Sequence, residues 1–548
     1  MDKQSLIALQ PPEGPRHPLH VLFAEIDGTK AQTAGKSNKS EDDYFQGGRS
    51  LPWYAVSVSA GMTMLSAGAF ISNPGWIYTE GLLAGASNLT IPLCIVFCTC
   101  TILPILYHSK VTTMGQFVNM RFGVRTRMVA IIVWLLNSFV LIGGFIYTPA
   151  LVLQSITGIS LNVWVPVTMI VAIIYTISGG IKAVIWTDTL QGVVLAIGTV
   201  VALIVAFSNL DQSFGEVMTL AAAVGKTISF DFDFRMDNYN IVLCVIGSFV
   251  MWVSYFGFNQ EQIQRYVTAR SVRDVKKTGI LSTLLMVGIY WMTYILGLVL
   301  YAFYQNNPHV LDFANSNNIF VDFIMHYMPS GVVGLMVAAM FAAAMSSLDS
   351  VLNSATAMFV KDIYEPYLAK GKKATLKQSM LFTCGISVVA VIFVYVYLSG
   401  SNSSIMQSIA SMSAPMQGTL TGLLFMMLFM PFVNDKGASV GCLSGFIISL
   451  IIKSFESAWG WNWLWCYVYA TVLAMVLSCL LSATVFRDPE ATRKAYPYTL
   501  KGASESMKGV TDATGYEIRP LKFDRYAAGP IIIFVALLIF LAWIQMAF

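Results

Sequence analysis

Long apolar segments alternate with short polar stretches along most of the chain. Thirteen of these segments are long enough, as helices, to cross or nearly cross a bilayer core about 30 Å thick. Helices also pair their own backbone N–H and C=O groups, which lipid would leave unpaired. The pattern therefore predicts an all-α polytopic membrane protein with spans at residues 53–72, 81–108, 128–153, 161–178, 184–207, 241–260, 280–303, 332–360, 380–398, 405–432, 438–452, 463–483 and 528–547.

The Lys and Arg residues are distributed unevenly between the connecting loops. If the polar N-terminal segment 1–52 is cytoplasmic, the loops on that side hold 24 Lys and Arg, and the loops on the other side hold three. Positive loops stay on the cytoplasmic side of a membrane. We therefore expect a multi-pass plasma membrane protein with a cytoplasmic N-terminus and a cytoplasmic loop at 484–527. The odd number of spans then places the C-terminus outside the cell.

The apolar segments fall into two groups of five. A first group at 53–207 and a second at 241–432 are separated by a polar extracellular connector, 208–240, and accessory helices follow at 433–548. Each group opens on a segment that small or polar residues interrupt, GMTMLSAG in the first and GSFVMWVSYFGFNQ in the second. Two successive groups with an odd number of spans insert in opposite directions, as in the inverted-repeat plan of secondary transporters.

Composition narrows the function further. The chain is 56% hydrophobic and 11% charged, whereas soluble proteins are about 25% charged. The net charge of +4 requires no nucleic-acid partner. The eight cysteines all lie in apolar runs, which argues against a disulfide framework or a zinc site. Neither a nucleophile–base pair nor a cofactor motif is recognisable, so we expect no enzyme activity and no cofactor.

A polar cluster lies inside the apolar segment that begins at Val332. The stretch MFAAAMSSLDSVLN (340–353) places Ser346, Ser347, Asp349 and Ser350 within little more than one helical turn. Serines alone are explained by close helix packing in lipid. A carboxylate at membrane depth is rare and usually faces a cavity, a pathway or a partner. Hydroxyls and freed backbone carbonyls together are suitable ligands for Na⁺.

Two further polar groups lie at the ends of spans. Asp188, in VIWTDTLQG, is either a helix N-cap near the cytoplasmic face or a second carboxylate that shares a cation or a proton with Asp349. The stretch YFGFNQEQIQ, from Tyr255 to Gln264, ends the sixth span. It is either the lining of an inner vestibule or a solvated helix end that leads into the basic loop 265–277.

Four stretches of the chain are similar to the sodium:solute symporter family, which includes sodium–glucose, monocarboxylate, vitamin, iodide and sialic-acid carriers. The resemblance covers about residues 42–486, and motifs at these separations are specific. It implies a five-plus-five inverted-repeat, LeuT-like core and Na⁺-driven uptake of a small organic solute by alternating access. The four stretches are DYFQGGRSLPWYAVSVSAGMTMLSA (43–67), GGIKAVIWTDTLQ (179–191), GFNQEQIQRY (257–266) and AAAMSSLDSVLNSATAMFVKDIY (342–364).

The resemblance also implies two ion sites. The principal Na⁺ site uses the hydroxyls of Ser346 and Ser347 and the backbone carbonyls of Ala343, Met62 and Leu65.

Some family members have a second sodium site, whose positions in this chain are Asp188, Asp349 and Ser350. Asp349 stands where the family usually has serine or threonine. We hypothesise that this extra carboxylate strengthens a second cation site or admits a proton.

The sequence says less about the identity of the solute. The polar sugar contacts of sodium–galactose relatives are missing, because Ala69, Asn88 and Val287 replace a Gln, a Glu and a Lys. The Arg of sialic-acid carriers is replaced by Leu141. The stretch FIYTPALVLQSITG resembles the monocarboxylate and multivitamin branch, so a monocarboxylate is favoured. The residues expected to contact the solute are Ala69, Asn88, Tyr255 and Asn259.

A different class of function is compatible with the same motifs. A non-transporting sensor or regulatory subunit that keeps the symporter fold remains an alternative, because a polar segment replaces the leading helix of bacterial relatives and Asp349 departs from the family pattern.

Overall fold

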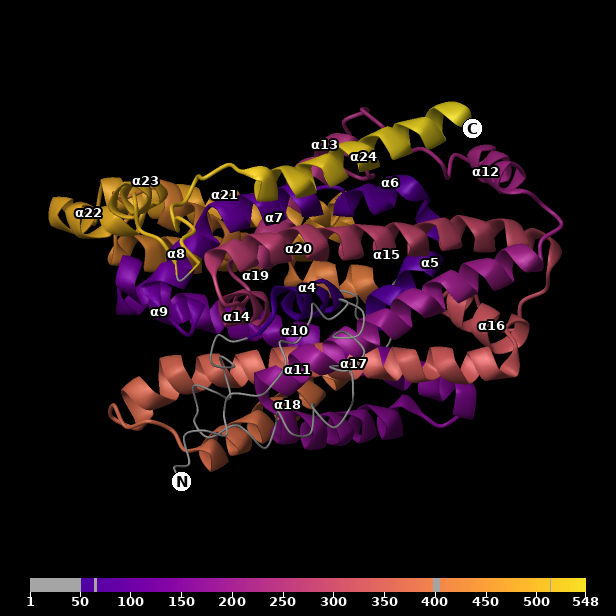
Figure 1. The fold of residues 1–548 in the computed structure, drawn as a ribbon, viewed down its shortest axis with the longest axis horizontal. Helices are drawn as coiled ribbons and strands as arrows, with labels where there is room; N and C mark the ends of the chain where they lie inside the picture. The colour runs from indigo at the N-terminus through magenta and orange to yellow at the C-terminus, as the bar shows by residue number, and fades with distance from the viewer. Residues whose placement is uncertain (1–50, 64–66, 398–404, 513) are drawn as a thin grey trace, which may run out of the picture.

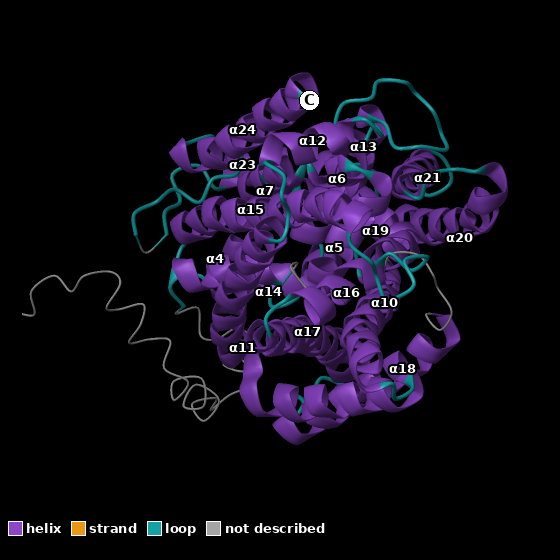
Figure 2. Ribbon diagram, turned by 90° about the vertical axis from the view of Figure 1, so that its right-hand side faces the viewer, coloured by secondary structure: helices purple, strands orange, loops and turns teal. Residues whose placement is uncertain are grey.

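The structure is a computed structural model that describes residues 51–63, 67–397, 405–512 and 514–548. Within these ranges helices joined by loops make up the fold, and β-structure is limited to the isolated bridges Leu51–Ala269 and Thr511–Glu517 (Figure 2). The prediction of an all-α fold is confirmed. Most of the N-terminal polar segment, residues 1–50, lies outside the described residues.

The helices follow the order of the apolar segments, with short helices between them (Figure 1). Those of the first group and the connector are α4 (Trp53–Met62), α5 (Ala67–Glu80), α6 (Leu82–Gly85), η2 (Ala86–Asn88), α7 (Ile91–Cys100), α8 (Ile102–Ser109), α9 (Met114–Arg121), α10 (Val124–Thr157), α11 (Leu161–Ser208) and α12 (Phe214–Ala222). Those of the second group are α13 (Ile241–Gly257), α14 (Gln260–Thr268), α15 (Val272–Asn306), α16 (Asn317–Tyr327), α17 (Ser330–Phe359), η3 (Val360–Leu368), α18 (Leu376–Tyr397) and α19 (Ile405–Phe429). The remaining helices are α20 (Asp435–Trp459), α21 (Leu464–Ala483), α22 (Pro489–Ala495), η4 (Tyr496–Tyr498), α23 (Leu500–Ser506) and α24 (Arg525–Ala547).

Ten helices in the described ranges are long and apolar enough to cross a membrane, or eleven if the bent pair α13–α14 counts as one span. The thirteen predicted segments differ mainly in two places. The first segment is divided between α4 and α5, on either side of residues 64–66, which lie outside the described residues. Residues 179–183, expected to form a loop, are helical and join the fourth and fifth segments within α11. Helical hydrogen bonding there satisfies the backbone without help from water.

The sixth predicted span ends in a sharp bend. The axes of α13 and α14 meet at 52°, because Asn259 has an extended backbone and the helix restarts at Gln260. Gly257, just before the bend, lies against its neighbours: an added Cβ would come within 2.7 Å of the Leu424 side chain. The polar stretch 259–264 is therefore the start of a new helix that turns into the bundle.

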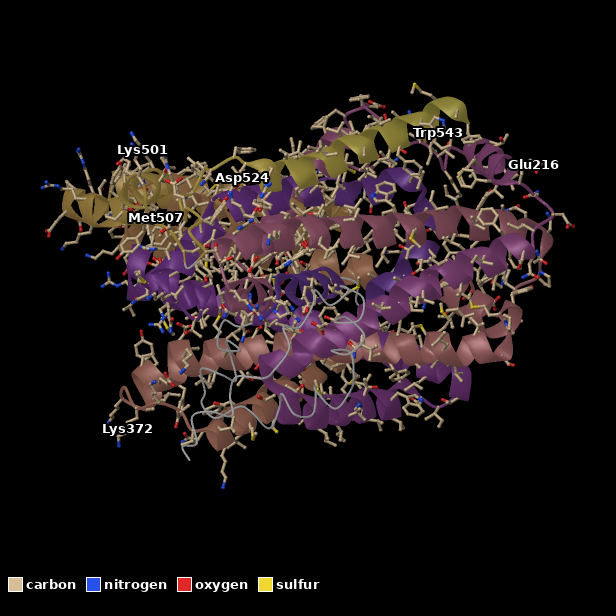
Figure 3. All side chains as sticks on the ribbon, in the orientation of Figure 1. Glu216, Lys372, Lys501, Met507, Asp524 and Trp543 are labelled. Carbon is tan, nitrogen blue, oxygen red and sulfur yellow. The ribbon has the colours of Figure 1, made fainter. Side chains whose placement is uncertain are left out.

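The two ends of the bundle carry different loops. Lys372 and Lys501, from two loops expected in the cytoplasm, lie toward one end of the molecule, and Glu216, from the expected extracellular connector, lies at the other (Figure 3). This arrangement agrees with the sidedness that the Lys and Arg distribution predicts.

Burial separates central helices from peripheral ones. The most apolar window of the Leu82–Ser109 segment is 89% buried and that of α15 is 72% buried, whereas those of α18 and α24 are each 28% buried. Because α18 and α24 are strongly apolar, their exposed faces are suited to lipid. The cluster of polar side chains described next lies between α4, α11, α14 and α17.

Candidate ion and solute sites

The broken first helix and the serine pair meet in the structure. Helix α4 ends at Met62, and the Ser347 hydroxyl donates a hydrogen bond to the Thr63 carbonyl at 3.3 Å. On α17, the Ser346 hydroxyl donates to the Ala343 carbonyl at 3.1 Å. Both serines are buried. The predicted ligands Met62, Ala343, Ser346 and Ser347 are therefore brought to one junction.

The chemistry of this junction fits a hard monovalent cation. Hydroxyl and backbone carbonyl oxygens lie together here: the Thr63 carbonyl at the end of α4, the Ser347 hydroxyl that donates to it, and the Ser346 hydroxyl beside it on α17. Such oxygens, without a large net charge, are typical ligands of Na⁺ in broken-helix transporters. No group of three or more His, Cys, Asp or Glu that could hold a metal ion occurs in the described part of the chain. The fifth predicted ligand, Leu65, lies outside the described residues.

A buried guanidinium joins four helices next to this junction. Arg265, on α14, donates to Asp188 Oδ2 on α11 at 2.9 Å and to the Ser59 hydroxyl on α4 at 2.9 Å. It also donates to the Ser350 hydroxyl on α17, and to the Glu261 carbonyl at 2.7 Å. Ser59 in turn donates to Asp188 Oδ2 at 2.5 Å. The Arg265 and Asp188 side chains both have no exposed surface.

At this network the structure decides against one of the two alternatives for each of two stretches. One alternative for residues 255–264 was a solvated helix end that leads into a basic loop beginning at Arg265. The bend at Asn259 instead turns Arg265 into the core, where its charge is compensated by Asp188. Asp188 is likewise no N-cap, because it lies within α11 and far from its ends. The sequence offered one signal for a buried arginine, a carboxylate in a distant apolar segment. The spacing between the two residues does not show that they pair.

Asp349 lies beside this network and is only 2% exposed. It interacts with the Thr176 side chain, and its charge is close enough to that of Asp188 for the two to repel each other. One oxygen of each carboxylate, Asp188 Oδ1 and Asp349 Oδ1, has no hydrogen-bond partner among the described residues. Of these two buried carboxylates only Asp188 is paired with Arg265, and each retains one acceptor oxygen without a partner among the described residues.

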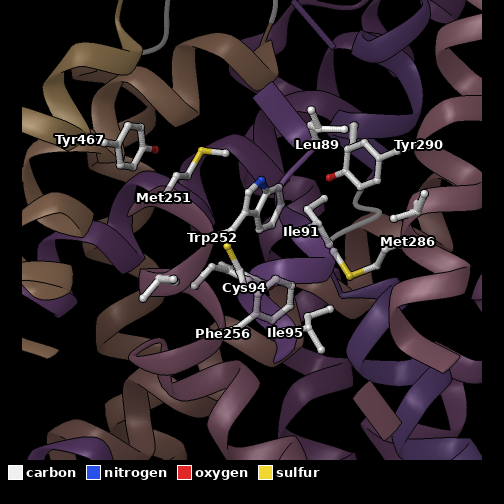
Figure 4. Packing of buried hydrophobic residues seen from close by; sticks show 14 of the residues in the cluster. Leu89, Ile91, Cys94, Ile95, Met251, Trp252, Phe256, Met286, Tyr290 and Tyr467 are labelled. Carbon is white, nitrogen blue, oxygen red and sulfur yellow. The ribbon is translucent and has the colours of Figure 1, made fainter. Parts of the chain in front are cut away.

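A narrow cavity of about 70 Å³ opens next to Thr63. About a third of its lining residues are aromatic, Trp252 and Tyr255 among them. Trp252 stacks on Phe256 with ring centroids 5.7 Å apart, and Figure 4 shows its place among Met251, Ile91 and Cys94. Glu261 is the one charged residue among the described residues that line this cavity.

The four residues expected to contact the solute have different positions. Asn88 and Tyr255 line the cavity; Asn88 donates to the Tyr294 hydroxyl, and the Tyr255 hydroxyl accepts from Gln262 at 2.9 Å. Asn259 is buried and donates to Glu261 Oε1 at 3.1 Å, so it holds a lining residue. Ala69 is buried on α5, away from the lining.

The stretch 259–264 is not a solvated helix end. Gln260 donates to the Thr112 carbonyl and accepts from the Met114 N–H, both at 2.9 Å. Gln262 donates to the Ala60 carbonyl of the first helix at 3.3 Å. These contacts connect α14 to α4 and to the segment before α9, and they turn Glu261 toward the cavity.

Comparison with known proteins places this geometry in context. Residues 44–445 match the model of the Sodium:solute symporter family. The chain is 32% identical to the sodium/sialic acid symporter SiaT of Proteus mirabilis over 60% of this chain and 67% of that protein. It is 32% identical to the sodium/sialic acid symporter NanT of Aliivibrio fischeri over 70% of this chain and 77% of that protein. Sodium-coupled monocarboxylate transporter 1 of Xenopus laevis is 25% identical over 78% of this chain and 69% of its own. These relatives are transporters rather than enzymes.

Solved structures agree on the fold. The substrate-bound outward-open state of a Na⁺-coupled sialic acid symporter superposes with a TM-score of 0.72 at 26% identity, covering 85% of this chain and 97% of its own. Mhp1, a nucleobase-cation-symport-1 family transporter, superposes at 0.55 and 13% identity over 84% of this chain and 100% of its own, which is a likeness of fold alone. The predicted LeuT-like architecture is confirmed.

Proposed function

Because the chain belongs to the sodium:solute symporter family, we propose that it couples the entry of Na⁺ to the uptake of a small organic solute by alternating access. The observation that carries this proposal is the position of Thr63. Its carbonyl accepts from Ser347 in the candidate Na⁺ site, and the same residue lines the cavity. A Na⁺ ion held there would fix the end of α4 against α17 and, with it, one wall of the solute cavity.

This arrangement gives a physical basis for coupling. A ligand that orders a shared element lowers the cost of ordering it for the second ligand, and the effect is reciprocal. Na⁺ held by Ser346, Ser347 and the carbonyls of Ala343, Met62 and Leu65 would raise the affinity for the solute, and the solute would raise the affinity for Na⁺.

We further propose a second cation or proton site at Asp188, Asp349 and Ser350. The free oxygens of the two carboxylates support it. Arg265 already binds Asp188 Oδ2 and the Ser350 hydroxyl, so a second cation would be held mainly by Asp349 and by Asp188 Oδ1. Arg265 also reduces the net negative charge of this site, which favours a monovalent ion over a divalent one.

The finer prediction of a monocarboxylate rests on the relatives. The monocarboxylate transporters align with more than three quarters of the chain at 25–27% identity. The cavity itself gives less support, because no Lys, Arg or His is among its described lining residues. We propose a plasma membrane location with a cytoplasmic N-terminus and an extracellular C-terminus, supported by the Lys and Arg distribution.

Uptake into proteoliposomes tests the proposal. Purified protein should accumulate a radiolabelled solute when an inward Na⁺ gradient is imposed, and not with a K⁺ gradient of equal size. A solute that stabilises the protein in a Na⁺-dependent manner but is never accumulated would instead identify the sensor alternative. Screening solutes by thermal shift with and without Na⁺ selects the compounds to label.

A further inference from the structure

Glu261 is a buried carboxylate that faces the solute cavity without a counter-ion. The residue is 1% exposed, and Asn259 donates to its Oε1 at 3.1 Å. Its other oxygen, Oε2, has no hydrogen-bond partner among the described residues. A buried carboxylate oxygen without a partner costs free energy unless a cation or a hydrogen-bond donor binds it.

The nearby arginine does not supply that partner. Arg265 contacts Glu261 only at the main-chain carbonyl, and its remaining donors go to Asp188, Ser59 and Ser350. No ion pair to the Glu261 carboxylate occurs in the part of the chain that the structure describes, nor does any basic residue line the cavity there. The cavity wall therefore holds a single carboxylate with which no described basic side chain pairs directly. The charge of Arg265 acts on it, but that guanidinium is already paired with Asp188.

The rest of the wall suits a cation rather than an anion. Aromatic rings of Trp76, Trp252, Tyr255, Trp463 and Tyr467 line the cavity. Aromatic faces attract ammonium groups, most strongly when both are removed from water. Leu141, at the position that corresponds to the Arg of sialic-acid carriers, also lines the cavity and brings no charge.

We propose that the co-transported solute carries a positively charged nitrogen, a protonated or quaternary amine, which binds between the Glu261 carboxylate and the aromatic wall. This inference rests on the proposed symport and replaces the monocarboxylate, which only the relatives support, with a cationic solute. The solute nitrogen would supply the charge that Oε2 lacks, and Asn259 would hold the carboxylate in place. The solute is small, because the cavity is narrow.

A second pocket, on the side expected to be extracellular, is also lined by acidic side chains. It shares Gln407 and Trp463 with the cavity, and its described lining residues include Glu80, Asp237 and Glu456 but no Lys, Arg or His. Two lysines outside the lining act on this pocket: Lys453 pairs with Glu456 at 3.2 Å, and the charge of Lys226 acts on Glu80. The three carboxylates therefore exceed the two lysines by one. A negative entrance raises the local concentration of cations, and it would serve Na⁺ and a cationic solute alike.

Thermal-shift and competition measurements on the full-length protein in Na⁺ test this inference. The probes are tetramethylammonium, choline and ethanolamine as cations, tert-butanol and ethylene glycol as neutral compounds of similar size, and pyruvate and lactate as anions. At least one cation should stabilise the protein in a Na⁺-dependent manner, and its neutral counterpart should not. Glu261→Gln should weaken binding of that cation by about 30-fold or more, and Glu490→Gln, at an exposed glutamate on α22, should leave it unchanged.

Leu141→Arg is the second variant, in case Glu261→Gln does not fold. It places a positive charge in the same cavity and should abolish cation binding. The inference is overturned if none of the cations stabilises the protein, if only neutral or anionic probes do, or if Glu261→Gln binds the cation with unchanged affinity. A Na⁺-dependent response to pyruvate alone would overturn the cationic solute and leave the proposed symport standing. Loss of the Na⁺ dependence itself would instead remove the symport.

Discussion

Arg265 and Asp188 form an ion pair at 2.9 Å in which neither side chain has any exposed surface. The pair connects α14 to α11, and through Ser59 and Ser350 it also holds α4 and α17. These four helices carry every described residue of both candidate ion sites. The pair is therefore placed to set the spacing of those sites.

Removing one partner of this pair should destabilise the protein strongly. Arg265→Ala leaves an uncompensated carboxylate in the core, and a broken buried pair costs about 3–5 kcal/mol. The double variant Arg265→Gln/Asp188→Asn should recover part of that loss, because it leaves no unpaired charge. Thermal unfolding in detergent measures both.

Lys494→Ala is the control, because Lys494 pairs with Glu490 on the surface, where both side chains are 76% exposed. It should unfold like the wild type. If Arg265→Gln/Asp188→Asn lost as much stability as Arg265→Gln and Asp188→Asn lose when measured singly and added together, the charges of Arg265 and Asp188 would not act on each other.

Asp349→Ser should change the ion coupling. This substitution restores the residue type that the family usually has at this position and removes one of the two carboxylates beside Arg265. We expect an altered number of Na⁺ ions per solute or an altered pH dependence of uptake, since the candidate second site loses its charge. Reversal-potential measurements in proteoliposomes give the number of ions directly. An unchanged stoichiometry together with an unchanged pH profile would remove Asp349 from the coupling mechanism.

The accessory helices α20 and α21 pack through glycine. A Cβ at Gly441 would lie 2.4 Å from the Cα of Ser478, so Gly441→Ala must push the two backbones apart. We expect a loss of about 1–3 kcal/mol in stability, seen as a lower unfolding temperature, with little change in Na⁺ dependence because these helices lie outside the ten-helix core. Gly385→Ala is the matched control, because a Cβ there meets nothing within 4 Å; it should be neutral or slightly stabilising.

The carboxylate that caps α24 should make stability depend on pH. Partial burial raises the pKa of Asp524, but hydrogen bonds from Tyr516 and the charge of Lys276 outweigh this, so its pKa lies below the ordinary value. Asp524 also accepts from the Tyr526 and Ala527 N–H groups. Because the pKa is lower in the folded state, the stabilisation is complete above the unfolded value of about 4 and disappears as the pH falls through the folded pKa.

Asp524→Asn keeps the cap and removes the charge, so it isolates this effect. The variant should unfold at a lower temperature than the wild type at neutral pH, and the difference should shrink as the pH is lowered toward the folded pKa. Thermal unfolding across a pH series measures it. A difference that stays constant into acid would show that the Asp524 charge contributes nothing.

Hydropathy predicted most of the architecture, because each span must be apolar over its whole length. It located nearly all of the long helices, the interruption near Met62 and the two-sided distribution of loops. It failed where a helix breaks or continues for local reasons. Residues 179–183 stay helical although two glycines precede a lysine, and the bend at Asn259 depends on one extended residue that hydropathy does not register.

The candidate site was only partly predictable for a related reason. Ser346, Ser347 and Asp349 can be recognised in the sequence, because they are polar residues inside an apolar run. Arg265 cannot be recognised in this way, because a run of basic residues follows it and the hydropathy pattern does not predict the bend that buries it. Glu261 could not be recognised either. Its role depends on two features of the fold: it faces a cavity formed by helices that are distant in sequence, and no basic side chain pairs with its carboxylate among the described residues.

The central claim is that Na⁺ binds where the end of α4 meets the serine pair of α17. Its most direct test is the Na⁺ dependence of solute uptake by Ser346→Ala/Ser347→Ala in proteoliposomes, with Ser454→Ala/Ser506→Ala, at two exposed serines outside both pockets, as control. We predict that the first variant loses at least tenfold in apparent Na⁺ affinity, or about 1.4 kcal/mol, and that the control behaves like the wild type. Uptake by the first variant that responds to a Na⁺ gradient as the wild type does would contradict the account.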